Sequence, residues 1–290
     1  MASSVFRQSY RPSACNVADV PVNPSFNFNF PPEIECEIFR ISARAHGEIG
    51  QRLLLVSRVV KAWVEPILYE MAWFGSTSAV TEAVIAKCGE PFWAFIKILA
   101  IGFGVDYEKA AEIMPLCTSI VGLAVWVTDL LRLPTLRDSE KTPHRLSLNL
   151  SLTTICHPTI LPDFSWPLFS RITHLEFVEP WDRCSSCAGW ELNLTHLAYK
   201  FDSEPEEILR NAAHISHVLE TCRFLQVFAL MNRSHAQHAD EEMRIVEDPR
   251  AVLMPQPYDV RQLWETQWYG VHDFWTEAEE IVRLQRTRFK

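Results

Sequence analysis

Six short apolar runs recur along the middle of the chain, and their spacing constrains the fold more than any other feature. They are FIKILAI (95–101), IVGLAVWV (120–127), RLSLNLSL (145–152), RITHLEFV (171–178), NLTHLAYKF (193–201) and FLQVFALM (224–231). Their central residues are Leu99, Leu123, Leu148, Leu175, Leu197 and Phe228, and successive centres are 22 to 31 residues apart. RAVLM (250–254) is a candidate seventh copy. Each run has roughly the form h-x-x-L-x-h, which places alternate side chains on one side of a β-strand.

Helix-like segments lie between the runs. Asp106 is a candidate N-cap, and Ser203 with Glu206 forms a capping box. The helix after Ser203 is expected to bury Ile208, Ala212, Ile215, Leu219 and Cys222. A strand followed by a helix or an irregular return, repeated about every 25 residues, predicts an irregular leucine-rich-repeat-like solenoid of the α/β class. An ordinary α/β domain with chance alternation is the alternative.

The chain divides into four predicted regions. Residues 1–29 are polar and without periodicity, which indicates a disordered lead-in. A short helical module follows at 30–70, the irregular repeats at 71–257 and a C-terminal capping helix region at 258–290. In that last region Asp273 is a candidate cap of a helix that buries Phe274, Ala278, Ile281 and Val282. We expect this helix to cover the open end of the solenoid, whose last repeat otherwise exposes its core.

Two amphipathic helices are predicted in the region 30–70. The first begins at Pro31, carries Ile34, Ile38 and Ile41 along one face, and ends near Gly47. The second runs from about residue 50 to Pro66, and its stripe is Leu53, Val56, Val60, Trp63 and Val64, although the region could also form three short helices. Because so few short helices bury little surface alone, this unit needs a partner or the rest of the chain.

Composition excludes several classes of function. The net charge of −9 argues against nucleic acid as a partner, since that needs a concentrated basic surface. No apolar run reaches the roughly 18–20 residues that span a bilayer, so no membrane association is expected, and no secretory signal begins the chain. Cys36, Cys117 and Cys222 lie in apolar stretches where a free thiol acts as a small hydrophobe. We expect the cytoplasm or the nucleus as the compartment.

Catalytic motifs are missing from the sequence. It has nine glycines and contains no P-loop, nucleophile elbow or HExxH motif, so we expect a protein that is not an enzyme and has no cofactor. Cys184 and Cys187 form the one CxxC pair, with His174 and His196 nearby in sequence. A single CxxC is a weak zinc signal, and a reduced dithiol is the preferred interpretation, so no metal is expected. A metal-binding or redox-active protein remains an alternative.

The alternation of the strands also predicts a second, exposed face. It carries Trp126, Asn149, His174, Glu176, His196 and Lys200, a candidate face for binding a target protein. His174 and His196 immediately precede the central leucines of neighbouring runs, which places them side by side. Trp126 is either a binding anchor or a residue packed on the next strand.

Residues 30–70 resemble the F-box, whose pattern is Leu-Pro-x-Glu, an apolar helix and then Val-(Cys/Ser)-(Lys/Arg)-x-x-x-x-Trp. Pro31 and Glu33 match the first part, and Val56, Ser57, Arg58 and Trp63 match the second. Phe30 stands where the pattern has leucine. The match covers about forty residues, and the whole layout resembles basidiomycete F-box proteins with irregular repeats.

This resemblance implies a substrate-recognition subunit that docks onto the Skp-type adaptor of a cullin–RING ubiquitin ligase. The residues that would bind the adaptor or form the core of the module are Pro31, Ile34, Ile38, Val56, Val60 and Trp63. The repeats would hold an unidentified protein target. The alternative is a repeat-based interaction scaffold without a ubiquitin-ligase role, motivated by Phe30 and the uneven repeats.

Overall fold

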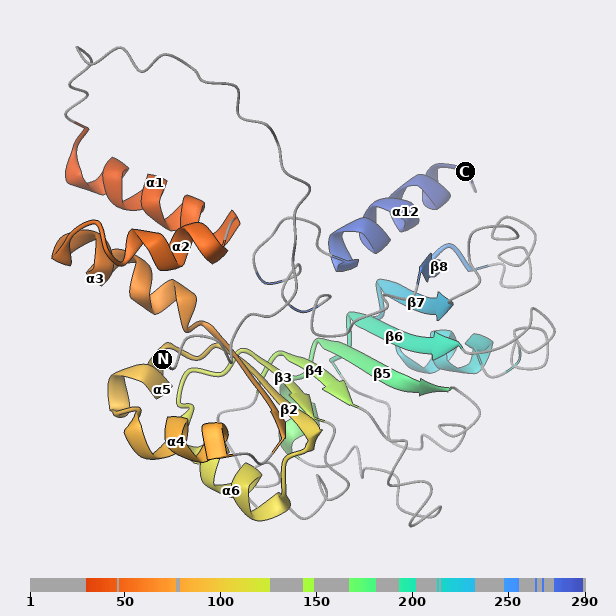
Figure 1. Ribbon diagram of the computed structural model, residues 1–290. Coiled ribbons are helices and arrows are strands. Elements are labelled where there is room, and N and C mark those ends of the chain that lie inside the picture. The colour runs from red at the N-terminus through yellow and green to blue at the C-terminus, as the bar shows by residue number, and fades with distance from the viewer. Residues whose placement is uncertain are drawn as a thin grey trace.

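A parallel β-sheet of eight strands forms the centre of the protein in a computed structural model (Figure 1). The structure describes residues 30–45, 47–76, 79–125, 143–148, 167–180, 193–201, 213, 215–232, 248–255, 264, 268 and 274–288. The strands are β1 (Met71–Ser76), β2 (Ile98–Gly104), β3 (Gly122–Val125), β4 (Arg145–Leu148), β5 (His174–Pro180), β6 (His196–Phe201), β7 (Val227–Asn232) and β8 (Ala251–Pro255). The chain is therefore of mixed α/β class, as predicted.

The strands follow one another across the sheet in the order of the sequence. Every neighbouring pair is parallel, from β1 and β2 to β7 and β8. In a doubly wound sheet the order reverses and creates a ligand-binding crevice at the switch point. Among the described strands the order never reverses, so the sheet has no such crevice.

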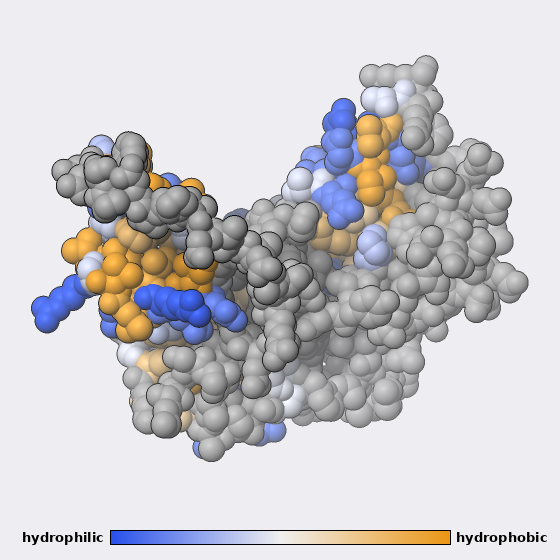
Figure 2. Space-filling view, turned by 45° about the horizontal axis from the view of Figure 1, so that its top comes forward, coloured by the Kyte–Doolittle hydropathy of each residue, from blue (hydrophilic) through white to orange (hydrophobic). Residues whose placement is uncertain are grey.

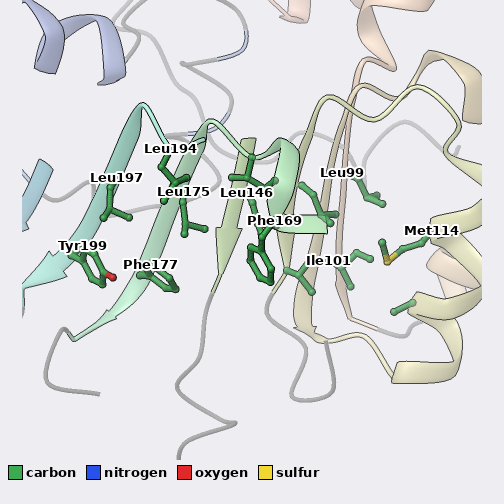
Figure 3. Close-up of a cluster of buried hydrophobic side chains, with 14 of the residues drawn as sticks. Leu99, Ile101, Met114, Leu146, Phe169, Leu175, Phe177, Leu194, Leu197 and Tyr199 are labelled. Carbon is green, nitrogen blue, oxygen red and sulfur yellow. The ribbon is translucent and has the colours of Figure 1, made fainter. Parts of the chain in front are cut away.

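One face of the sheet carries the main hydrophobic core (Figure 3). Leu99, Leu123, Leu175, Leu197 and Phe228 are buried and lie in one register row, as predicted. The fourth strand differs, because Leu146 rather than Leu148 pairs with both Leu123 and Leu175. RLSLNLSL has leucines at every second position, so a slip of two residues leaves the same face buried.

The first strand was missed by the sequence prediction. In β1 the register partner of Leu99 is Ala72, so this strand lacks the leucine that marks the others. The predicted seventh copy, in contrast, is confirmed as β8, whose Ala251 pairs with Phe228.

Short helical segments pack against the main core. They are α4 (Ala79–Lys87), α5 (Glu90–Phe95), α6 (Tyr107–Leu116) and the 3-10 turn η3 (Pro167–Arg171). Asp106 is at the N-cap position of α6, as predicted. Residues 215–221 are also helical, and the predicted burial of Ile215, Leu219 and Cys222 is confirmed. Ser203, Glu206, Ile208 and Ala212 lie outside the described residues.

The second face of the sheet is also apolar at both ends. Near β1 to β3, Met71, Ile98, Ala100 and Ala124 contact Trp264. Gly122 leaves room for that tryptophan, since a Cβ there would lie 2.9 Å from the indole ring. At the other end, α12 (Phe274–Arg288) packs on Ala198, Val227, Ala229, Met231, Val252 and Met254.

The position of α12 corrects a prediction. Its buried residues are those expected, since Phe274, Ala278 and Val282 are buried and Ile281 is partly buried. The helix nevertheless lies on the second face of β6 to β8, rather than over the main core at the end of the strands. The reason is that these parallel strands are apolar on both faces and need cover on both. Asp273 lies outside the described residues.

The N-terminal module consists of α1 (Pro32–Ala45), α2 (Gly47–Leu53) and α3 (Arg58–Leu68). The expected single second helix is divided in two. Ser57 is the N-cap of α3 and its Oγ accepts a hydrogen bond of 3.1 Å from the Val60 amide, so a new helix begins there. Gly47 begins α2 instead of capping the first helix, and Pro66 lies inside the last turn of α3.

Glu70 joins this module to the sheet. Its side chain is 5% exposed, and Oε1 lies 2.6 Å from Lys97 Nζ and 3.6 Å from Arg44 of α1. Trp268 Nε1 donates a hydrogen bond of 3.1 Å to Oε2. The Glu70 carbonyl accepts hydrogen bonds from the amides of Lys97 and Ile98. The carboxylate therefore connects a helix of the module, the start of β2 and the C-terminal part of the chain.

No helix in the described part of the chain has the length and apolar character that a membrane crossing needs.

Candidate functional site

An exposed apolar surface lies on the module. We call it the docking surface, and it consists of Phe30, Ile34, Ile38, Ile41, Ile49, Leu55, Val56 and Val59, which are 41% to 87% exposed. Figure 2 shows apolar side chains gathered over this part of the molecule. Single exposed apolar residues are ordinary on a protein surface, but a group of this kind marks an interaction site.

The docking surface exists because α1 is apolar on two sides. One side, with Phe39 and Ala43, faces α3 and packs on Val60, Val64 and Ile67. The Phe39 and Trp63 rings lie with their centroids 6.2 Å apart. The other side carries Ile34, Ile38 and Ile41, which one small module cannot bury as well.

The structure separates the six residues predicted to bind an adaptor or to form the module core. Pro31, Ile34, Ile38 and Val56 are exposed and belong to or border the docking surface. Val60 is buried in the module core, and Trp63 is half-buried against it. Ile34, Ile38 and Ile41 lie on one face of α1, as predicted, and the module turns this face toward solvent.

Leu55 and Val59 are further members that the sequence reasoning did not name. Leu55 lies in the turn between α2 and α3, and at 87% it is the most exposed large apolar residue described. The run LLLV at 53–56 was the available signal, since four apolar residues in a row cannot all lie on one buried face of a helix.

A second candidate region lies on the sheet beneath α12. His174 and His196 are register partners, and their rings stack with centroids 4.1 Å apart and planes within 4° of parallel. Their predicted side-by-side arrangement is confirmed. The prediction that this face is exposed is wrong for Glu176 and His196, which are 5% and 4% exposed, and His174 is half-buried.

The cause of this burial is the C-terminal part of the chain. Trp275 of α12 meets both histidine rings edge to face, at centroid distances of 5.4 and 5.3 Å. Trp126 and Asn149 lie outside the described residues. Lys200 pairs with Met231 in the sheet, and its side chain is not among those described.

Two threonines contact the stacked histidines in the same way. Thr173 Oγ1 donates to the His144 carbonyl at 3.2 Å and lies 2.9 Å from His174 Nδ1. Thr195 Oγ1 repeats this arrangement one strand on, with the Thr173 carbonyl at 3.1 Å and His196 Nδ1 at 2.8 Å. Each hydroxyl is therefore within hydrogen-bonding distance of a carbonyl oxygen and of a ring nitrogen, and the direction of the bond to the ring depends on the tautomer of the histidine.

Burial shifts two ionisable groups of this region in opposite senses. Loss of water lowers the pKa of His174 to about 3, helped by the nearby charges of His196, Arg145 and His144. His174 is thus neutral at physiological pH. Burial raises the pKa of Glu176 to about 7, an effect that the side chains of Ser147 and Trp264 partly oppose.

We predict that Glu176→Gln makes the free energy of unfolding less dependent on pH between pH 4.5 and about 7. The folded state holds the proton of Glu176 more tightly than the unfolded state, because the folded-state pKa is above the ordinary value. The contribution of the protonated side chain to stability is therefore fully present below pH 4.5 and is lost as the pH rises toward about 7. The uncharged variant avoids that loss, and at pH 8 it should be more stable than the wild type by roughly 1 to 3 kcal/mol.

Urea denaturation at pH 5 and pH 8 measures this difference. Glu277→Gln, on the exposed side of α12, is the control and should leave the pH dependence as in the wild type. A Glu176→Gln protein whose stability falls between the two pH values as steeply as that of the wild type would contradict the assignment.

Metal ligands do not converge in the described part of the chain. No group there of three or more histidine, cysteine or acidic side chains could hold an ion. Cys184 and Cys187 lie outside the described residues. Cys117 and Cys222 are buried, as expected for thiols that act as hydrophobes, whereas Cys36 is only half-buried. Burial raises the pKa of Cys117 to about 12 and that of Cys222 to about 11. Such thiols are poor nucleophiles.

Comparison with known proteins gives no relative: no family model matches the chain, and no curated protein or solved structure is significantly similar to it.

Proposed function

We propose that the chain is a non-catalytic substrate-recognition subunit of a Skp–cullin–F-box ubiquitin ligase. In this proposal the α1–α3 module docks onto a Skp-type adaptor, and the sheet with its connections binds a protein target. Such a complex operates in the cytoplasm or the nucleus. The observation that carries the proposal is the docking surface, which combines with the F-box-like motif between Phe30 and Trp63.

The chemistry of the docking surface supports a protein partner. It presents branched aliphatic side chains from α1 and from the turn before α3, the residues that fill hydrophobic grooves in helix-mediated recognition. A helical module with its own core can keep its shape while this surface is open to water. Burial of the surface on a partner would then stabilise the complex by removing apolar area from solvent.

The sheet supports the finer proposal that the repeats form an irregular solenoid. Each strand pairs with the strands before and after it in sequence, and the same register row of large apolar residues runs from β2 to β7. In a solenoid, each repeat contacts its neighbours in this way. The number of residues between successive strands differs, which accounts for the uneven steps.

A repeat-based scaffold without a ligase role is the second candidate. Phe30 favours it, because this residue is 45% exposed and puts an aromatic ring where the F-box pattern has leucine. On this reading the docking surface binds a partner other than a Skp-type adaptor.

The double variant Leu55→Asp/Val56→Asp distinguishes these candidates. Both residues are highly exposed, so the variant should fold, whereas two carboxylates on the docking surface should weaken adaptor binding at least about 30-fold. The measurement is binding of a purified Skp-type adaptor to the full chain, by calorimetry or by co-purification.

Phe224→Asp is the matched control. Phe224 is 66% exposed but lies in the turn before β7, away from the module, so this variant should bind the adaptor as the wild type does. Failure of the wild-type chain to bind the adaptor would refute the ligase proposal and leave the scaffold. Equal loss in both variants would place the adaptor elsewhere.

A further inference from the structure

The outer side of α1 carries a stripe of three isoleucines. Ile34, Ile38 and Ile41 recur at i, i+4 and i+7, which places them on one face of the helix, and they are 48%, 45% and 57% exposed. Ala43 lies on the opposite side of α1 and is fully buried in the module core. The module therefore holds one side of α1 and leaves the isoleucine stripe open to water.

A row of four charged residues runs along one flank of this stripe. In chain order they are Glu33, Glu37, Arg40 and Arg44. They recur at i, i+4, i+7 and i+11, so they share one line along the helix, next to the isoleucines. The first three are exposed, and the side chain of Arg44 is 37% exposed. The half of the row near the start of α1 is thus acidic, and the half near its end is basic.

The helix dipole accounts for only part of this distribution. Acidic residues near the start of a helix and basic ones near its end complement the dipole, but the effect falls off within the first and last turns. Glu33 lies in the first turn of α1 and Arg44 in the last, whereas Glu37 and Arg40 lie between these turns. A row that changes sign at its middle has a second property, since it is complementary to a reversed copy of itself.

We propose that α1 is a homodimerisation element, whose isoleucine stripe packs antiparallel on the same stripe of a second copy of the chain when no adaptor is bound. In such a pair, related by a two-fold axis, the same flank of both helices lies on one side of the interface. The acidic half of each row then faces the basic half of the other. Parallel packing would place glutamate against glutamate and arginine against arginine, which is unfavourable.

The remaining polar groups of α1 are compatible with this arrangement. On the other flank of the stripe, Glu35 lies across from Ser42 of the second copy, so no like charges meet there. The Ser42 hydroxyl donates a hydrogen bond of 2.8 Å to the Ile38 carbonyl and needs no partner in the interface. Arg44 also approaches the Glu70 carboxylate, at 3.6 Å, but its exposed part remains accessible to the second copy.

The dimer would regulate the proposed ligase role. Ile34 and Ile38 belong to the docking surface, so one chain cannot offer them to a second copy and to an adaptor at the same time. An excess of Skp-type adaptor should therefore dissociate the dimer. This competition rests on the proposed function, whereas the dimer itself does not.

Analytical ultracentrifugation of the full chain without adaptor tests the dimer. The wild type should associate as its concentration rises to about 100 μM, and salt should weaken the association because it screens exposed charges. Glu33→Lys/Glu37→Lys makes the whole row basic and should raise the dissociation constant of the dimer at least about tenfold. Arg40→Glu/Arg44→Gln removes the basic half and should have a similar effect, while glutamine at position 44 keeps a donor for Glu70.

An equimolar mixture of the two variants is the decisive sample. A wholly basic row then meets an acidic one, so the mixture should dimerise although neither variant does so alone. Recovery of the dimer also shows that both variants fold, since an unfolded chain would not be rescued by its counterpart.

Glu108→Lys/Glu112→Lys is the matched control, because it makes the same change of charge at two exposed glutamates four positions apart on α6, away from the module (Figure 1). It should dimerise as the wild type does. A wild type that stays monomeric overturns the proposal and assigns the stripe to the adaptor or to another partner. Wild-type association of Glu33→Lys/Glu37→Lys, equal loss in the control, or no recovery in the mixture overturns it too. Because no adaptor is present, these outcomes are independent of the ligase test.

Discussion

Alanine in place of Leu197 should lower the free energy of unfolding by about 3 to 4 kcal/mol. Leu197 is fully buried at the middle of the sheet, and its register partners are Leu175 and Phe228. Both partners belong to paired strands whose backbone hydrogen bonds hold them in place, so the site cannot collapse into the space that three lost carbon atoms leave. The cost therefore includes a cavity as well as lost burial.

Chemical denaturation of the wild type and the variant measures this effect. The same substitution at Leu284, which is 45% exposed on α12, is the control and should cost less than about 1 kcal/mol. Equal costs at the two positions would mean that Leu197 is not part of the core.

Methionine in place of Lys97 should destabilise the protein by about 3 kcal/mol. The substitution keeps the length of the side chain but leaves the Glu70 carboxylate, which is 5% exposed, without its partner at 2.6 Å. Arg44 at 3.6 Å and the indole of Trp268 remain as partners, so the loss is partial. Denaturation with urea at neutral pH measures it.

A double-mutant cycle provides the test of this explanation. If the cost comes from an unpaired buried charge, Glu70→Gln/Lys97→Met should be more stable than Lys97→Met alone. Lys61→Met removes an exposed pair with Glu65 at 3.7 Å and should change the stability by less than about 1 kcal/mol. Strictly additive effects of the Glu70 and Lys97 substitutions would contradict the proposed coupling.

The parallel strands and their core row were predictable because they depend on local alternation. Leucine at a fixed place in each run indicated both the strand and its buried face, and it also placed His174 beside His196. Searching for this leucine failed in β1, where Ala72 takes its place. It also gave the wrong central residue in β4, where several leucines alternate and Leu146 is the one in register. A register that can slip by two residues is not fixed by one strand alone.

The candidate sites depended on contacts between distant segments, which periodicity does not encode. Ile38 and Val60 both lie on apolar helical stripes, and only the packing of α1 on α3 decides that the first is exposed and the second buried. Similarly, the pattern of α12 indicated which of its residues are buried but not which face of the sheet buries them. The position of Trp275 over the histidines follows from that choice of face.

The order of the strands has a consequence for how the chain is made. Since each strand pairs with the one before it, the sheet can grow during synthesis as soon as successive strands leave the ribosome. The second face, however, receives Trp264, Trp268 and α12 only when nearly the whole chain has emerged, and the Glu70–Trp268 bond joins residues 198 positions apart. Until then Ile98, Val227 and Val252 lack their cover, so the nascent chain presents an apolar sheet face on which chaperones can bind and other chains can aggregate.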